Sequence, residues 1–171
     1  MSSTFQDRCR YPRGVRIRAG ASNERDYCVV LWLEALRERD GQVQGVEVAA
    51  RVRAKFDSPV VRFAVVDEPP IAFALTVDAG RSERRVALLE LLAVAPSQAG
   101  RGLGRALLAD AMREASRLNF SAIELRVREG NHRAAALYAS AGFVPRGEPV
   151  PHPLGGPPML EYTRDLLPLP A

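Results

Sequence analysis

Apolar and polar residues along the chain follow two periods, one typical of strands and one typical of helices. Residues 15–19 alternate and predict a short strand, whereas residues 86–94 form an apolar run with the length of a buried strand. Pro96 cannot donate a hydrogen bond within a sheet, so it marks the end of that run. Apolar positions at helical spacing, with Val29, Leu33 and Leu36 on one face of the first helix, predict two consecutive helices. We expect the first from Ser22 or Asn23, as N-cap, to about Leu36, and the second from about Gln42 to Phe56.

The remaining elements follow from the same periods and from the Gly and Pro residues that interrupt them. We expect strands at 60–66, 71–77, 121–127, from 143–144 and at 159–166, and helices at 104–118 and 131–141. Residues 145–158 are rich in Pro and Gly and predict a long loop. The order β-α-α-β-β-β-α-β-α-β-β predicts an α/β (α+β) fold, with a mixed sheet of about six or seven strands and helices on both faces. The crossover through 104–118 predicts that its flanking strands are parallel.

The length of 171 residues suits a single domain, which we place at residues 15–166. A basic arm at 1–14 and a short tail at 167–171 flank it. The net charge is +4, and Lys55 is the only lysine among 24 basic residues. The arm lacks aromatic residues at repeated spacing, so we expect it to be solvated or to bind a second copy in a homodimer, rather than to bind nucleic acid.

Other composition features exclude several classes of site. No apolar stretch approaches the roughly 18 residues of a membrane span, and no secretory signal is recognisable, so we expect a cytoplasmic protein without a membrane partner. Cys9 and Cys28 match no zinc or disulfide spacing, and His132 and His152 do not complete a metal set. We therefore expect free thiols and no metal.

Three glycines follow the 86–94 strand at alternate positions, Gly100, Gly102 and Gly104. Glycines let backbone N–H groups approach a ligand, and the start of a helix adds free N–H groups and a positive dipole end. This arrangement is suited to hold a phosphate, with Arg101 and Arg105 adding full charges. The alternative is a tight strand-to-helix turn without a ligand.

A second motif runs from Asn131 to Phe143, N-H-R-A-A-A-L-Y-A-S-A-G-F. Helical spacing places Leu137 and Tyr138 on the same side of the helix as Ala134. Taken alone, Tyr138 is better explained as a core aromatic residue.

Together, the two motifs resemble those of the GNAT superfamily of acyl-CoA N-acyltransferases. The resemblance covers roughly residues 15–166 in element order and is sharpest in LLAVAP, GRGLGRALL and the second motif. Two positions depart from the family pattern. Ala99 stands where the family has Gln or Arg, and Arg126 stands where enzymes that acetylate protein N-termini often carry Glu.

The resemblance implies that acetyl-CoA is the acyl donor. It implies that backbone groups of residues 92–94 pair with the pantetheine arm like an added strand, and that N–H groups of the glycine loop hold the pyrophosphate. Asn131 would contact the arm and Tyr138 would lie near the thioester sulfur. The residues expected to bind the donor are Leu92, Ala93, Val94, Gly100, Arg101, Gly102, Leu103, Gly104, Arg105, Asn131 and Tyr138.

Amine acetylation needs a base for the amine and an acid for the departing thiolate. Tyr138 is the candidate acid. Glu90 is the candidate base, because it is the only charged residue in the 86–94 strand and burial there would make a carboxylate a stronger base. Glu90 could instead be a structural partner of an Arg on a neighbouring strand, and a bound water could serve as the base.

Other functions stay open at this point. Glu124 lies about 20 residues beyond the glycines, as in dinucleotide-binding redox domains, but the glycine spacing differs from theirs. A P-loop is excluded because no Gly-Lys-Ser/Thr occurs. A GNAT-like domain could also bind acyl-CoA without catalysis, as a sensor. For the acceptor we expect a small-molecule amine, with a protein or peptide amine as the alternative.

Overall fold

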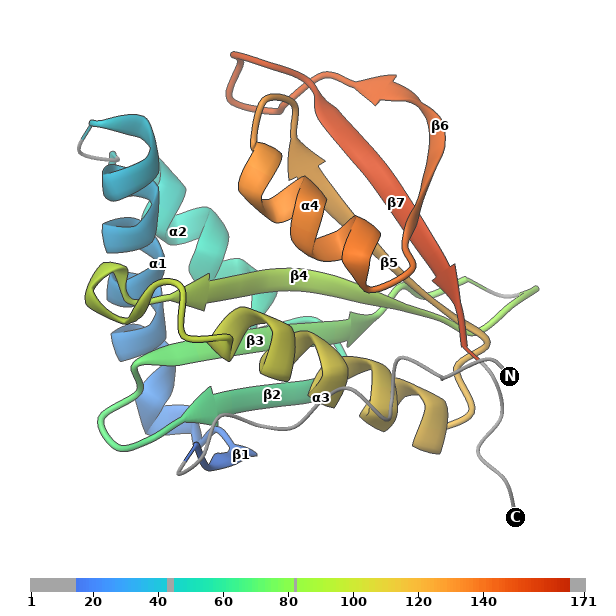
Figure 1. Cartoon of the computed structure of the whole chain (residues 1–171), viewed down its shortest axis with the longest axis horizontal. Coiled ribbons are helices and arrows are strands. Elements are labelled where there is room, and N and C mark those ends of the chain that lie inside the picture. Colours follow the sequence, from blue (N-terminus) through green and yellow to red (C-terminus); the bar gives the residue numbers. More distant parts are fainter. Residues whose placement is uncertain (1–14, 43–44, 82, 167–171) are drawn as a thin grey trace.

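The computed structural model of the chain describes residues 15–42, 45–81 and 83–166; the expected arm at 1–14 and tail at 167–171 lie outside this part. Figure 1 shows the helices and strands of the chain in the order predicted from the sequence. The strands are β1 (Ile17–Ala19), β2 (Val60–Val66), β3 (Ala72–Asp78), β4 (Val86–Val94), β5 (Ala122–Arg128), β6 (Val144–Val150) and β7 (Met159–Asp165). The α-helices are α1 (Arg25–Asp40), α2 (Val46–Lys55), α3 (Leu103–Arg117) and α4 (His132–Ser140), and short 3₁₀ helices lie at Ser22–Glu24 and Pro96–Gln98.

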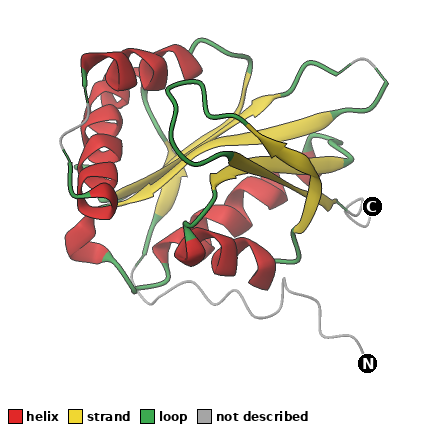
Figure 2. Ribbon diagram, turned by 90° about the horizontal axis from the view of Figure 1, so that it is seen from above, coloured by secondary structure: helices red, strands yellow, loops and turns green. Residues whose placement is uncertain are grey.

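The strands form one mixed sheet of seven strands, in the order β1-β2-β3-β4-β5-β7-β6. All neighbours are antiparallel except β4 and β5, which are parallel and are joined through α3. The predicted fold class and the predicted parallel crossover are therefore confirmed. Figure 2 shows helices on both sides of the sheet. One core packs under α1 and α2, and the other packs under α3 and α4.

The central strands β4 and β5 separate after four residues. Leu89 pairs with Leu125, and no later residue of β4 pairs with β5. Beyond that point β4 remains hydrogen-bonded to β3 as far as Val94, whereas β5 pairs only with β7. Figure 1 shows the two strands diverging. Within the described residues, the edge of β4 that faces β5 is thus unpaired from Glu90 to Val94.

A β-bulge interrupts β4 at Glu90. Leu75 of β3 pairs with Leu91 and the next residue, Thr76, pairs with Leu89, so Glu90 is the extra residue. Side chains of β4 alternate between the two faces of the sheet, and the bulge reverses this alternation. As a result, Leu89 packs in the core under α3 and α4, while Leu91 packs in the core under α1 and α2.

The edge strand β6 corrects the prediction of a loop over 145–158. Residues 144–150 form an exposed strand at the end of the sheet, and only 151–158 remain a loop. Proline is tolerated here because an edge strand has one side that needs no ladder hydrogen bonds. The pairing with β7 also shifts register between Arg146 and Val150, which accommodates the irregular segment.

The first helix, α1, differs from the prediction in its cap, its length and its buried face. Neither Ser22 nor Asn23 caps α1; instead, the Glu24 carboxylate accepts a hydrogen bond of 2.8 Å from the backbone N–H of Ala21. The helix continues to Asp40, beyond the predicted end at Leu36, and stops where Gly41 adopts a left-handed conformation. Its most buried residues are Cys28, Val29 and Leu31, and Leu33 and Leu36 are only half-buried.

Candidate active site

The glycine loop presents backbone donors at the start of α3. Gly100 and Gly102 both have φ of +79°, which favours glycine, and Gly102 is the N-cap of the helix. Ala106 donates to the carbonyl of Gly102, so α3 leaves the N–H groups of its first residues without acceptors. No residue in the described ranges accepts a hydrogen bond from the N–H groups of Leu103, Gly104 or Arg105. These donors and the positive helix end provide an anion site.

The helix α3 packs against the unpaired part of β4 at Gly104. A Cβ at this position would lie 3.5 Å from Leu137 Cδ2, 3.6 Å from Leu92 Cδ2 and 3.9 Å from Val94 Cγ2. The start of α3 therefore packs against β4 and α4 at once. This close contact joins the unpaired edge of β4 and the N–H groups of α3 into one surface.

Two arginines lie beside these donors and both are exposed. Arg101 donates to Gln98 Oε1, and Arg105 Nη2 donates to Ser140 Oγ over 3.2 Å. Gln98 is the residue that stands one position before the expected Gln or Arg of the family pattern. The hydrogen bond from Arg101 shows that this side chain takes part in the loop despite its shifted position.

Tyr138 on α4 is buried, with 8% of its surface exposed. Its ring packs edge-on against Phe143, with 5.9 Å between the ring centroids. Burial raises the pKa of the Tyr138 hydroxyl to about 12, so the group holds its proton at neutral pH. Among the described residues no side chain or backbone group hydrogen-bonds to that hydroxyl.

Asn131 performs a structural role that the sequence motif did not reveal. Its Oδ1 accepts a hydrogen bond of 3.2 Å from the backbone N–H of Ala134, which caps α4. The amide NH₂ group of Asn131 is not used by this cap. It remains a donor for the predicted contact with the pantetheine arm.

Glu90 is paired, but with a different partner from the one considered in the sequence. Lys55 at the end of α2 donates to Glu90 Oε2, whereas an Arg on a neighbouring strand had been the structural alternative. The Glu90 side chain is 22% exposed and that of Lys55 is 33% exposed. The pair thus lies under α2 on the face opposite α3, where solvent still reaches both groups.

Comparisons with known proteins identify the family. The model of the acetyltransferase (GNAT) family matches residues 22–143, more than half of the chain. The chain belongs to this family. Its membership confirms the expected class of enzyme, an acetyl-CoA-dependent acetyltransferase. No curated protein sequence matches the chain.

Solved structures share the GNAT fold at low sequence identity. The ribosomal-protein-S18-alanine N-acetyltransferase from Escherichia coli is 21% identical, with a TM-score of 0.69 over 92% of this chain and 96% of that one. The protein yncA from Salmonella typhimurium, solved with its cofactor acetyl-CoA, is 18% identical, with a TM-score of 0.68 over 92% and 96%. The paia N-acetyltransferase from Thermoplasma acidophilum, in complex with coenzyme A, is 16% identical, with a TM-score of 0.65 over 86% and 97%.

The position that departs from the N-terminal acetylating GNAT enzymes lies on β5. Arg126 is exposed, and its Nε donates to Glu161 Oε1 on β7 over 2.8 Å. The two residues are directly opposite in the antiparallel ladder. Arg126 therefore forms a cross-strand ion pair on the sheet surface.

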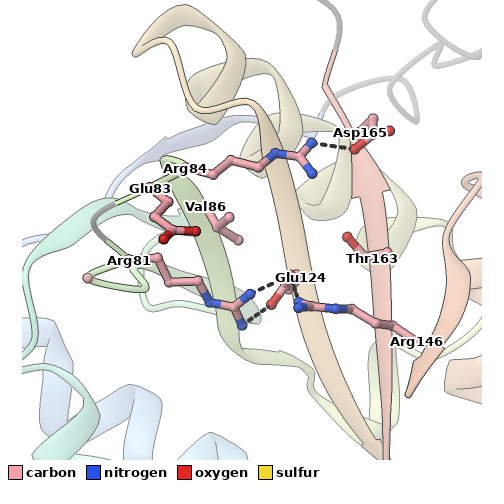
Figure 3. Close-up of a pocket in the computed structure, with 9 residues that line it drawn as sticks. Arg81, Glu83, Arg84, Val86, Glu124, Arg146, Thr163 and Asp165 are labelled. Carbon is pink, nitrogen blue, oxygen red and sulfur yellow. Dashed lines mark hydrogen bonds and ion pairs between the residues drawn. The ribbon is translucent and has the colours of Figure 1, made fainter.

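A surface cavity of about 690 Å³ lies at the other end of the sheet (Figure 3). From β4 it is lined by the first residue, Val86, whereas the glycine loop follows the last residue, Val94. Its charged groups bind one another: Arg81 and Arg146 both donate to Glu124, and Arg84 donates to Asp165. Glu124, the residue that a dinucleotide site would require, is thus held far from the glycines, which does not favour the redox alternative.

Two other kinds of site, a metal site and a reactive thiol, were also sought among the described residues. They contain no group of three His, Cys, Asp or Glu side chains that could hold a metal ion. Cys28 is a free, buried thiol whose pKa is raised to about 12, mainly by burial, and Cys9 lies outside the described part.

No helix in the described part of the chain is long and apolar enough to cross a membrane.

Proposed function

We propose that this GNAT enzyme transfers the acetyl group of acetyl-CoA directly to the primary amine of a small molecule. The observation that carries the proposal is the unpaired edge of β4, which leads to the free N–H groups of α3. A donor that carries an amide-containing arm followed by a pyrophosphate would place the arm on the edge of β4 and the pyrophosphate at the N–H groups of α3.

The backbone of Leu92, Ala93 and Val94 binds the pantetheine arm as an added strand would bind. The amides of that arm match the alternating N–H and C=O groups of a free strand edge. The N–H groups from Gly100 to Arg105 hold the pyrophosphate, and Arg101 and Arg105 add charge. The relatives solved with acetyl-CoA and coenzyme A support this choice of donor.

In the transfer step, Glu90 or a water bound to it takes a proton from the acceptor ammonium. The free amine attacks the thioester carbonyl, an N–C bond forms and the C–S bond breaks. Tyr138 then gives its hydroxyl proton to the departing thiolate, and the N-acetyl nitrogen loses its second proton, which restores the Tyr138 hydroxyl. The proton taken from the ammonium leaves to solvent. The hydroxyl is protonated before each turnover, as a general acid must be, although burial raises its pKa to about 12 and makes it a weaker acid than free tyrosine.

Two features favour a small acceptor. Arg126 occupies the position where the N-terminal acetylating relatives often carry Glu, and it is bound to Glu161. The loop at 151–158 contains four prolines and loses little conformational entropy when it closes over a ligand. Enclosure of this kind benefits a compact ligand more than an extended peptide.

The test is a thiol-release assay with acetyl-CoA against polyamines, amino acids, aminoglycosides and peptides. A small amine should exceed the best peptide at least tenfold in kcat/KM. Calorimetry with acetyl-CoA and with NAD, run in parallel, should show binding of acetyl-CoA alone. Acetyl-CoA binding without turnover of any amine would support the sensor alternative, and preference for peptides would overturn the small-molecule acceptor.

A further inference from the structure

Four basic side chains from four segments lie near one another. Arg39 lies in the last turn of α1, Arg51 on α2, Arg128 at the end of β5 and His152 in the loop between β6 and β7. We call these residues the loop basic cluster. Figure 1 shows the end of α1 and the loop between β6 and β7 at the same end of the molecule.

Arg128 lies next to the loop between β6 and β7. Its Nη1 lies 3.9 Å from the position that a Cβ would take at Gly156, so its guanidinium lies directly beneath the loop. The backbone of the loop is tied to the same strand, because Glu129 donates to the carbonyl of Pro158 over 2.8 Å. His152 is half-buried, and its Nδ1 accepts from the backbone N–H of Leu154 over 3.1 Å.

The four groups are close enough to act on one another. Burial lowers the pKa of His152, and the charges of Arg128, Arg51 and Arg39 lower it further. Asp40 is a carboxylate in the same network. Its pKa is lowered by the hydrogen bond from Arg39 and also by Arg128.

The loop basic cluster has more positive charge than its neighbours balance. Asp40 is engaged by Arg39 through two hydrogen bonds of 2.6 and 2.8 Å. Neither Arg51 nor Arg128 forms an ion pair or a side-chain hydrogen bond with any residue of the described ranges. Two guanidinium groups are therefore ready to bind an anion that the folded chain does not itself supply.

The loop basic cluster is also close to the transfer chemistry. Arg51 precedes Lys55 by four residues on α2, so the two side chains lie on one helix face with their Cβ atoms about 6 Å apart. Lys55 contacts Glu90, the candidate base. The carbonyl of Arg128 accepts from the N–H of Asn131 over 3.0 Å, next to the expected pantetheine contact.

We propose that the loop basic cluster binds an anionic group of the acceptor, which is then a small zwitterion with a primary amine and a carboxylate or phosphonate. This inference rests on the proposed transfer to a small amine and names its substrate class. The amine reaches Glu90 while Arg51 and Arg128 bind the anionic end about one helical turn away. Planar guanidinium groups suit both carboxylate and phosphonate oxygens.

The experiment compares acceptors that differ only in the anion. 3-Aminopropionate and 2-aminoethylphosphonate are measured against the neutral 3-aminopropanamide and propylamine, each with saturating acetyl-CoA. The wild type should show at least tenfold higher kcat/KM for one anionic amine than for the neutral pair. Which anion is preferred distinguishes a carboxylate from a phosphonate acceptor.

Variants then assign the preference to the cluster. Arg51→Gln and Arg128→Gln should each raise KM for the anionic amine by about tenfold or more. They should leave kcat, the KM of propylamine and the Kd of acetyl-CoA within about twofold. Arg37→Gln is the matched control, because it removes the same charge from an exposed position in the last turn of α1. Comparing each variant with the wild type for the same amine cancels differences in amine basicity.

Four results would overturn the inference. Equal use of anionic and neutral amines by the wild type, or an unchanged KM in folded Arg51→Gln and Arg128→Gln, removes the subsite while leaving amine acetylation in place. A rise in the Kd of acetyl-CoA in these variants assigns the arginines to the donor instead. Absence of acetyl-CoA binding and of all turnover overturns the proposed function, and the subsite with it.

Discussion

Lys55 at the end of α2 donates a hydrogen bond to Glu90 at the bulge of β4. The only lysine of the chain thus contacts the only charged residue of this central strand. A partly exposed pair of this kind contributes little to stability, about 1 kcal/mol or less. We therefore expect the Lys55–Glu90 pair to act in catalysis, because the bulge places a carboxylate where β4 and β5 begin to diverge.

Replacing Glu90 with Gln should lower kcat most at low pH. Acceptor amines are then almost fully protonated, so a base is most needed, and at high pH abundant free amine should restore much of the rate. The measurement is kcat from pH 6 to 10 with one small amine. Lys55→Gln, which removes the other half of the pair, is the control for loss of the ion pair alone. A uniform loss of rate at all pH values together with a lower Tm would indicate a structural role.

Gly102→Glu should abolish detectable binding of acetyl-CoA, because it adds bulk and negative charge where the pyrophosphate is expected. Calorimetry measures the Kd. Gly102 has φ of +79°, so any side chain there also strains the backbone. Gly80→Glu is the matched control, since Gly80 has φ of +66° and open space around its Cβ position. Normal affinity in a folded Gly102→Glu enzyme would show that the pyrophosphate lies elsewhere.

Tyr138→Phe should reduce kcat by about 10²- to 10⁴-fold, the usual contribution of general acid catalysis. The substitution deletes only a hydroxyl that has no hydrogen-bond partner among the described residues, so the free energy of unfolding should change by about 0.5 kcal/mol or less. Tyr162→Phe, on β7 and packed against the same core, is the control. A kcat within about threefold of wild type would assign Tyr138 to packing.

Glu24→Gln should lower Tm in a pH-dependent manner. Hydrogen bonds from Arg18, and then from the backbone of Ala21, lower the pKa of Glu24 to about 2. The ionised carboxylate therefore stabilises the fold above its unfolded pKa of about 4.3, and this stability is lost as pH falls towards 2. Thermal unfolding should show a deficit for Glu24→Gln of about 1 kcal/mol at pH 7 that disappears near pH 2. A deficit independent of pH would assign it to side-chain packing.

The sequence was most informative where local chemistry decides the structure. The apolar run before Pro96, the glycine spacing and the Asn131 to Phe143 motif each predicted an element and its place in the order. Each signal lies within about 13 residues, so it needs no knowledge of distant partners. The fold class, the parallel crossover and the expected donor followed from these segments.

Features that depend on distant contacts could not be predicted. Lys55 and Glu90 are 35 positions apart, and only the packing of α2 on β4 brings them together. Asp110 is 1% exposed and is paired with Arg62 of β2, although its helical context gave no signal of burial. Arg51 and Arg128 likewise belong to no sequence motif. Arg146, which the sequence placed in a loop, is bound to Glu124 in the cavity at the other end of the sheet.

The last prediction concerns the loop at 151–158 as one wall of the acceptor site. It is tied to β5 through Pro158 and lies next to Arg128 at Gly156, so it can limit the acceptor site to compact ligands. Deleting 153–156 should raise KM for small amines by about tenfold, because enclosure and the contacts to Arg128 are lost. The Kd of acetyl-CoA should not change, since α3 and β4 form the expected donor surface. Pro151→Ala is a milder companion that adds flexibility without shortening the loop. If the deletion accelerates small-amine turnover, or if peptides exceed small amines tenfold in the wild type, the loop does not enclose the acceptor.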